Sequence, residues 1–216
     1  MSELTDHPIP VSPGALSELL AELCFGAVAS SERRLRVAVD GAEAATPGTL
    51  ADSLVEPLRA RGVPAVRVHA ADFLRPASLR LEFGRTDPDA FYDQWLDAGG
   101  LNREVLTPWG ASGSGRYLPS LWDAASDRAA RSEYVPVPPR GVLLVDGALL
   151  LGRGLPFDLT VHTRLTVPAL RRRTPPDQAW TLPAFERYEV EVEPERVADL
   201  VIRADDPRRP AVVLNR

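Results

Sequence analysis

The sequence predicts an α/β fold in three layers (α/β/α), with a mostly parallel central sheet between two layers of helices. Short β-branched runs alternate with helical stretches along the 216 residues, and such alternation implies parallel strands joined by right-handed crossovers. The strongest strand candidate, residues 141–151 (GVLLVDGALLL), is apolar on both faces, which is typical of the centre of a parallel sheet. The length suits one domain with a substantial core.

The first half of the chain contains one strand, helix, strand unit preceded by a helix. Ser12 and Pro13 are a suitable cap and first residue for the leading helix, and Pro57 is expected to kink or interrupt the second helix. In order, we expect a helix at 12–29, a strand at 35–41, a helix at 49–61 and a strand at 65–73.

The second half adds the remaining strands and a polar, aromatic and Pro-rich middle region. We expect a helix at 88–98, strands at 141–151 and 157–166, a short helix ending at 171–173, a helix at 182–192, a strand at 198–204 and an edge strand at 211–214. This organisation predicts a flexible lead-in over 1–11 and a single domain over 12–216. Residues 74–139 form a substrate-side insertion, and residues 171–187 form a lid.

Composition limits the partners of the chain. A net charge of −5 predicts no binding to nucleic acid, because proteins that bind it usually carry a basic face. The single cysteine, Cys24, cannot form an internal disulfide, and no run approaches the ~18 apolar residues of a membrane span. The sequence therefore predicts a cytoplasmic protein with no membrane contact and a small-molecule partner, and it leaves a homo-oligomer open.

One loop carries most of the chemical information. Residues 37–51 (VAVDGAEAATPGTLA) follow the spacing of a phosphate-binding loop, GxxxxGK[ST], whose amides cradle phosphates while its lysine and hydroxyl serve the transferred phosphate and magnesium. Gly41 is present, but the last three positions read Thr46, Pro47 and Gly48. All 25 cationic residues are Arg. A biased composition explains Lys giving way to Arg, but not Lys giving way to Pro.

With the other segments, this loop resembles the uridine kinase family of P-loop nucleoside kinases. The resemblance runs from about residue 34 to 213 and rests on the order of DGAEAATPGTLA, HAADFLRP, GRTDPDAFYDQWLD, GRYLPSLWD, VLLVDGALLL, RRRTPPD, ERY and ADLVIRADDPRRP. It implies a P-loop NTPase-like fold with a small lid and a substrate-binding insertion. It also implies ATP and magnesium as cofactors if the protein is active, and a nucleoside, a nucleotide or another anion as ligand.

The resemblance also assigns roles to individual residues. Cofactor binding would fall to Gly41, Thr46, Gly48, Thr49, Arg171, Arg172 and Arg173. Substrate contacts would come from Tyr92, Tyr117, Asp123 and Arg187, and magnesium would be held by Asp146 and Thr49. The family's catalytic base opens a DDFxRP-like motif. Here that position is Ala71, so Asp72 is the remaining candidate, although neighbours on a strand point to opposite faces.

Several of these residues also have a purely structural interpretation. The pair Asp40–Gly41 suits a simple turn, and the triple arginine suits a helix C-terminus. An acid such as Asp146 inside an apolar strand is costly unless it is paired, which favours a site. Metal binding is not expected at His69 or His162. The four tryptophans are expected to be packing residues: Trp95, Trp109, Trp122 and Trp180.

Three functions remain open from the sequence. The preferred one is a uridine kinase-like protein that is impaired or inactive and acts by binding, regulation or assembly, needing neither ATP nor magnesium. The alternative is a working nucleoside or small-molecule kinase that uses Asp72, Thr49 and the arginines at 171–173. A structural protein with a closed pocket is the third. Substituting Thr46→Gly, Pro47→Lys, Gly48→Ser and Ala71→Asp together is expected to restore nucleotide binding if the scaffold is intact.

Overall fold

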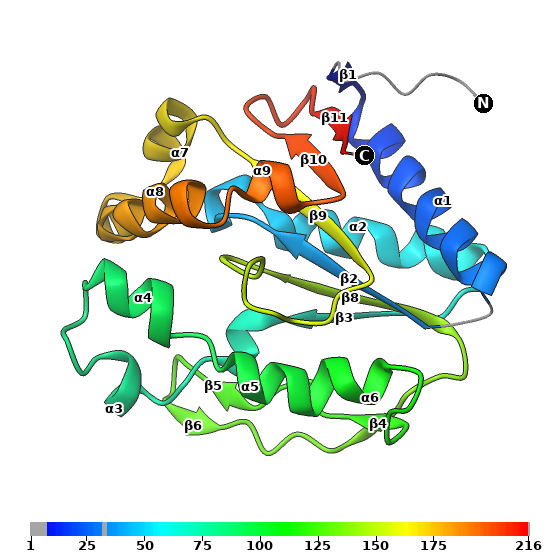
Figure 1. The fold of residues 1–216 in the computed structure, drawn as a ribbon, viewed down its shortest axis with the longest axis horizontal. Helices are drawn as coiled ribbons and strands as arrows, with labels where there is room; N and C mark the ends of the chain where they lie inside the picture. Colours follow the sequence, from blue (N-terminus) through cyan, green and yellow to red (C-terminus); the bar gives the residue numbers. More distant parts are fainter. Residues whose placement is uncertain (1–7, 32–33, 216) are drawn as a thin grey trace.

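A computed structural model describes residues 8–31 and 34–215. Within these residues the main sheet has seven strands in the order β1-β11-β10-β9-β2-β8-β3 (Figure 1). The strands are β1 (Ile9–Pro10), β2 (Arg34–Asp40), β3 (Ala65–His69), β8 (Gly141–Gly147), β9 (Leu159–Arg164), β10 (Leu200–Arg203) and β11 (Ala211–Leu214). The neighbours from β10 to β3 are all parallel, and β11 is antiparallel to β10 and β1. The mostly parallel sheet is therefore confirmed.

Helices and short turns surround this sheet. They are α1 (Pro13–Ser31), η1 (Glu43–Ala45), α2 (Pro47–Ala60), η2 (Ala70–Phe73), α3 (Ala77–Arg80), α4 (Pro88–Gln94), α5 (Ala98–Leu101), η3 (Asn102–Leu106), α6 (Thr107–Trp109), α7 (Val167–Arg173), η4 (Pro176–Thr181), α8 (Leu182–Glu191) and α9 (Pro194–Val197). Two small antiparallel pairs complete the middle region: β4 (Arg116–Tyr117) with β7 (Val135–Pro136), and β5 (Trp122–Asp123) with β6 (Arg128–Ala129).

The three layers follow from alternation along the central strand β8. Val142 and Leu144 pack into the cluster that contains α1 and α2, whereas Leu143 and Val145 pack into the cluster that contains α5, η3 and α6. Successive side chains of a strand point to opposite faces, so an all-apolar strand needs helices on both sides. Figure 1 shows α1 and α2 on one side of the sheet and α5 and α6 on the other.

Several element ends differ from the expectation. The strand expected at 65–73 ends at His69, and residues 70–73 form the turn η2. Strand β8 likewise ends at Gly147 rather than residue 151. Helix α2 begins at Pro47, where a proline costs no intrahelical hydrogen bond. Pro57 lies within α2 and does not end it.

The expectations at the two chain ends also need correction. Strand β11 is not at the edge of the sheet, because Ile9 and Pro10 of β1 pair with its outer side. The flexible lead-in was expected over residues 1–11, but residues 9–10 belong to the sheet, and residues 1–7 lie outside the described residues. Among helices in the described ranges, none has the length and apolarity needed to cross a bilayer.

Two groups of elements lie beyond the carboxyl ends of the parallel strands. One is α4, which belongs to the middle region. The other consists of α7, η4 and α8, in the region expected to be a lid. Helix α8 and turn η4 both contact α4, so the two sides meet above the strand ends (Figure 1). Ligands of open parallel sheets bind at this end.

Candidate functional site

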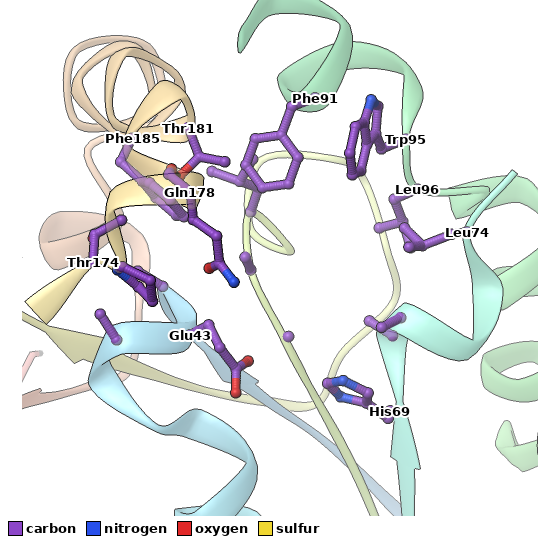
Figure 2. Close-up of a pocket in the computed structure, with 18 of the residues that line it drawn as sticks. Glu43, His69, Leu74, Phe91, Trp95, Leu96, Thr174, Gln178, Thr181 and Phe185 are labelled. Atoms are coloured by element: carbon purple, nitrogen blue, oxygen red, sulfur yellow. Dashed lines mark hydrogen bonds between the residues drawn. The ribbon is translucent and has the colours of Figure 1, made fainter. Parts of the chain in front are cut away.

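A cavity of about 770 Å³ lies between the loop after β2, the end of β3, α4 and the lid (Figure 2). Its walls include Ala42 to Ala44 and Thr46 from the loop, and His69 to Ala71 from the end of β3. Gly147 to Leu149 contribute from the end of β8. The volume falls within the range of small-molecule sites. The fold thus brings the predicted phosphate loop, the position of the family's acid and the lid to one chamber.

In the loop that resembles a phosphate cradle, backbone amides donate hydrogen bonds to carbonyls of the same loop. The amide of Ala45 donates to Ala42 O at 2.8 Å, and the amide of Thr46 donates to Glu43 O at 2.9 Å. Pro47 has no amide hydrogen. Three consecutive positions therefore offer no free amide to an anion.

Thr46, at the position of the second glycine in the loop pattern, adopts a backbone conformation that glycine favours. Its φ of 56° and ψ of 49° lie in the left-handed region, which is a genuine outlier for a β-branched residue. Gly41, in contrast, is required by packing: a Cβ there would lie 2.0 Å from Thr163 Oγ1. Backbone conformation therefore distinguishes Thr46, and close packing distinguishes Gly41.

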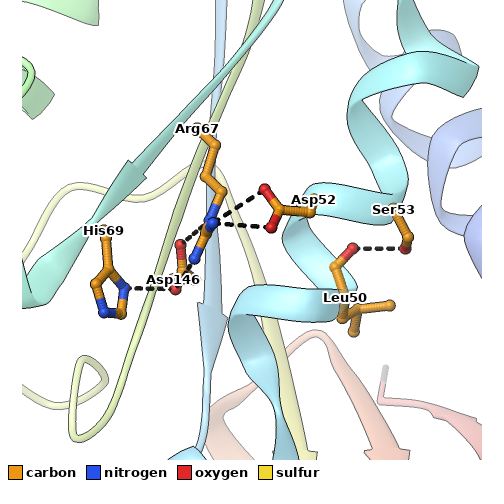
Figure 3. Close-up of polar contacts among 6 residues, drawn as sticks. All are labelled: Leu50, Asp52, Ser53, Arg67, His69 and Asp146. Carbon is orange, nitrogen blue, oxygen red and sulfur yellow. Dashed lines mark hydrogen bonds and ion pairs between the residues drawn. The ribbon is translucent and has the colours of Figure 1, made fainter.

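Side chains of the protein bind both oxygens of the carboxylate at the end of β8 (Figure 3). Arg67 Nε lies 2.6 Å from Asp146 Oδ1, and Arg67 Nη2 lies 3.0 Å from Oδ2. His69 Nδ1 lies 2.7 Å from the same Oδ2. Asp146 has a side chain that is 0% exposed. The second side of the Arg67 guanidinium binds Asp52, at 2.9 and 3.0 Å.

Strand register explains this cluster. His69 of β3 is the Cα partner of Asp146 on β8, and Arg67 lies two residues earlier on the same face of β3. Burial would raise the pKa of the Asp146 carboxyl, but hydrogen bonds from His69 and Arg67 outweigh it and lower that pKa. The hydrogen bond to Asp146 also raises the pKa of His69. Asp146 is therefore an ionised carboxylate that is held by the Arg67 guanidinium and by His69.

Gly48 lies directly against the same guanidinium. A Cβ at this position would be 2.6 Å from Arg67 Nη2 and 3.1 Å from Asp146 Oδ2. A hydroxyl-bearing residue therefore does not fit at Gly48 while Arg67 occupies its present place. Thr49 follows at the start of α2 and is exposed; it does not line the cavity.

The position of the family's catalytic acid faces the cavity, but only as a methyl group. Ala71 lines the cavity and Asp72 does not. Because residues 70–73 form a turn rather than a strand, the argument from opposite strand faces does not apply to Asp72. Asp72 is half-buried, and burial raises the pKa of its carboxyl, with repulsion from Asp146 adding to the effect and His69 opposing it.

Two of the three lid arginines are engaged by the protein. Arg171 forms an ion pair with Glu186 at 2.7 Å. Arg173 lines the cavity, but its Nη1 and Nη2 donate to the carbonyls of residues 204 and 205 at 2.9 and 2.6 Å. Arg172 is exposed. These contacts hold the lid to the loop after β10, so a phosphate role for the arginines stays a proposal.

The predicted substrate residues divide into two groups. Arg187 stacks over the Tyr92 ring at 4.1 Å and pairs with Asp93 at 2.8 Å and with Asp89 at 3.1 Å. This group fastens α8 to α4. Tyr117 packs against Trp109 in the core, and Asp123 caps a turn by accepting from Ser126 Oγ at 2.5 Å. Neither Tyr117 nor Asp123 lines the cavity.

The contact between Arg187 and α4 predicts a change in lid dynamics. The substitution Arg187→Met should change the global free energy of unfolding very little, because the ion pairs are partly exposed. Amide hydrogen exchange over residues 176–191 should nevertheless become faster, since α8 loses its charged contacts to Asp89 and Asp93. The surface variant Arg59→Met, which breaks an exposed pair with Glu56, is the control. Unchanged exchange in the lid would contradict this role of Arg187.

A buried network connects the start of the loop to the lid. Asp40 is 0% exposed; it accepts from the Leu150 amide at 2.8 Å and from the Tyr188 hydroxyl at 3.1 Å. His162 Nδ1 lies 2.7 Å from the same carboxylate. Burial raises the pKa of Tyr188, so its hydroxyl stays a donor. Asp40 is thus more than a turn residue, since it joins β2, β9 and α8.

Sequence reasoning missed the aromatic wall of the cavity. Trp109 is a core residue, as expected, but Trp95 and Trp180 line the cavity together with Phe91 and Phe185. The spacing of Phe91 and Trp95, four residues apart at the end of α4, was a usable signal for a shared face. The partnership of His69 with Asp146 had no such signal, because it depends on strand register.

Solved structures share this fold. A possible uridine kinase from Bacillus stearothermophilus aligns with a TM-score of 0.68 at 20% identity, covering 87% of this chain and 98% of that chain. A candidate fructose transport system kinase from Silicibacter sp. TM1040 aligns with a TM-score of 0.57 at 24% identity, covering 79% of this chain and 88% of that chain. No protein-family model and no curated protein matches the chain. The likeness shows that this chain has a P-loop kinase fold.

Proposed function

We propose that this P-loop kinase-like chain binds a small molecule in its cleft and does not transfer phosphate. One observation carries the proposal: the Arg67 guanidinium and His69 occupy both oxygens of Asp146. Phosphoryl transfer depends on positioned phosphates and on cations that stabilise the spread negative charge. In the uridine kinase family, the acid at the position of Asp146 would organise magnesium. Here the Arg67 side chain occupies the hydrogen-bonding positions of that acid.

The residues of the site do not fit magnesium and ATP. A magnesium ion would need carboxylate or water oxygens, but the Asp146 oxygens already accept from Arg67 and His69. The hydroxyl position beside them is Gly48, which contacts the same guanidinium. The amides of Ala45 and Thr46 are paired within the loop. The site is therefore better suited to a ligand bound without a metal.

The kind of ligand is supported by two further observations. The neighbours of known fold carry names that point to small molecules, a uridine kinase and a fructose transport system kinase. The net charge of −5 argues against a nucleic acid. A small-molecule receptor with a regulatory or assembly role agrees with both. Its cytoplasmic setting and any homo-oligomer stay predictions from the sequence.

An active kinase with a non-standard phosphate site is less well supported. It would use Asp72 as base and the lid arginines as phosphate ligands. Asp72 does not line the cavity, and Arg171 and Arg173 are engaged by Glu186 and by backbone carbonyls. A working site would have to exchange these contacts for ligand contacts.

The proposal predicts that Mg-ATP has no effect on the protein. With uridine or cytidine as acceptor, ADP release should equal that of a control without protein. Adding magnesium should not increase the thermal stabilisation of the protein by ATP. A true ligand at a hundred times its Kd would stabilise the fold by about 2.7 kcal/mol, which a thermal shift assay detects readily. Magnesium-dependent turnover that disappears in Asp72→Ala would overturn the proposal and favour the active kinase.

A further inference from the structure

The lid and α4 together build an aromatic wall from two distant parts of the chain. Phe91 contacts Trp95, Trp180 and Phe185 at ring-centroid distances of 5.3, 5.7 and 6.0 Å, and Trp95 lies 5.3 Å from Trp180. All four side chains line the cavity of about 770 Å³, and Figure 2 labels three of them, Phe91, Trp95 and Phe185. Aromatic side chains provide large apolar contact area and favour stacked or edge-on ring partners. The wall therefore suits a flat ring.

His69 faces the same space from the side opposite Phe91 and Trp95 (Figure 2). Its side chain is 36% exposed, and its Nδ1 is held 2.7 Å from Asp146 Oδ2. An ionised carboxylate only accepts hydrogen bonds, so Nδ1 carries the hydrogen. Nε2 has no hydrogen-bond partner within residues 8–31 and 34–215. The cavity thus has, opposite its aromatic wall, a polar group whose orientation is fixed by Asp146.

The charged groups around the cavity do not favour a phosphate chain. Glu43 extends its carboxylate into the space from the loop (Figure 2). Arg153 and Arg173 also line the cavity, but both donate to backbone carbonyls of the protein. A polyphosphate would approach the Glu43 carboxylate, and it would meet two arginines that each already give two donors to carbonyls of the protein.

We propose that the cavity binds a flat aromatic compound that carries one hydrogen-bonding group and no phosphate. Its ring packs on the wall of Phe91, Trp95, Trp180 and Phe185, and its polar group meets His69 Nε2. This inference rests on the proposed function and adds the chemical class of the ligand. None of the residues by which the resemblance would recognise a nucleoside lines this cavity: Tyr92, Tyr117, Asp123 and Arg187.

Calorimetric titration of the full chain with 2-naphthol tests the ring. Decahydro-2-naphthol, which has the hydroxyl but no aromatic ring, should bind at least about tenfold more weakly, because ring stacking is lost. Trp180→Leu should weaken the binding of 2-naphthol by about tenfold. The control Trp122→Leu changes a tryptophan outside the cavity and should leave the affinity unchanged. Thermal unfolding of each variant verifies that it is folded.

Comparison of 2-naphthol with naphthalene tests the polar point. His69→Gln retains an amide that can donate to Asp146 but removes the ring nitrogen. This variant should bind 2-naphthol roughly three- to tenfold more weakly, which is the range of one hydrogen bond. Its affinity for naphthalene should be unchanged. Equal weakening of both compounds would mean a structural role and would remove His69 from the site.

The outcomes separate this inference from the proposed function. Binding of uridine or uridine monophosphate in the cavity without binding of 2-naphthol would overturn the aromatic class and leave the proposed function standing. An affinity for 2-naphthol that neither Trp180→Leu nor His69→Gln changes would also overturn the inference. Magnesium-dependent ADP release would overturn the proposed function. If the folded protein binds neither kind of compound, both fall.

Discussion

Replacing Arg67 with methionine should destabilise the protein by about 2 to 3 kcal/mol. Breaking one partner of a buried ion pair costs ~3–5 kcal/mol, because a buried charge is left uncompensated. The value should be lower here, since Arg67 is 29% exposed and His69 remains beside Asp146. Urea denaturation of the variant and of the unchanged protein measures the difference.

Two controls separate the charge effect from simple truncation. Arg196→Met breaks an exposed pair with Glu193 and should cost less than about 1 kcal/mol. The double variant Arg67→Met with Asp146→Asn should lose less stability than Arg67→Met alone, because no carboxylate is left unpaired. If Arg67→Met cost no more than Arg196→Met, the charge pairing of Asp146 would be contradicted.

The pH dependence of this effect has a definite sign. The folded protein holds the pKa of Asp146 below its usual value, so the pairing contributes stability above the unfolded pKa of about 3.9. That contribution is lost as the pH falls through the folded pKa, where the carboxylate becomes protonated. The difference between the unchanged protein and Arg67→Met should therefore shrink below about pH 4.

Restoring the four signature residues should not by itself restore binding of Mg-ATP. The fourfold variant Thr46→Gly, Pro47→Lys, Gly48→Ser and Ala71→Asp places a side chain at position 48, where a Cβ lies 2.6 Å from Arg67 Nη2. Adding Arg67→Val to these changes removes two of the three hydrogen bonds to Asp146 and opens the space beside residue 48. This fifth substitution should increase the affinity for Mg-ATP by at least about tenfold, or 1.4 kcal/mol, as measured by calorimetry.

This expectation differs from the one drawn from the sequence, in which the four substitutions restore nucleotide binding if the scaffold is intact. Circular dichroism checks that both variants are folded, and excess EDTA should remove the gain of the fivefold variant if magnesium carries it. Equal affinity of the fourfold and fivefold variants would show that Arg67 does not obstruct the site. Absence of binding in both would mean that the loop has diverged beyond its signature positions.

The fold was predictable because local patterns carry it. The apolar run at 141–151 identified the central strand, and the run ending at Asp40 and Gly41 identified the strand before the loop. The ends of these elements were less predictable. Residues 70–73 continue a strand-like pattern but form a turn, because the chain leaves the sheet after its last pairing at His69.

The site was predictable only where the sequence motif itself is the site. The loss of the loop lysine, of the hydroxyl at Gly48 and of the acid at Ala71 can be read directly from the chain. The contact of Arg67 with Asp146 cannot be read from the chain in this way. Arg67 and Asp146 are separated by 79 residues, and their contact depends on the parallel register of β3 and β8.

Hydrophobic periodicity and motif spacing are local properties, so the chain alone indicates an α/β protein with a loop that resembles a phosphate loop but has no lysine. The groups that surround this loop in space depend on tertiary contacts. Strand register brings Arg67 and His69 to Asp146, and the packing of the lid on α4 brings Trp95 and Trp180 to one wall. Both are long-range contacts, which arise from how neighbouring elements pack and not from the residues beside them in the chain.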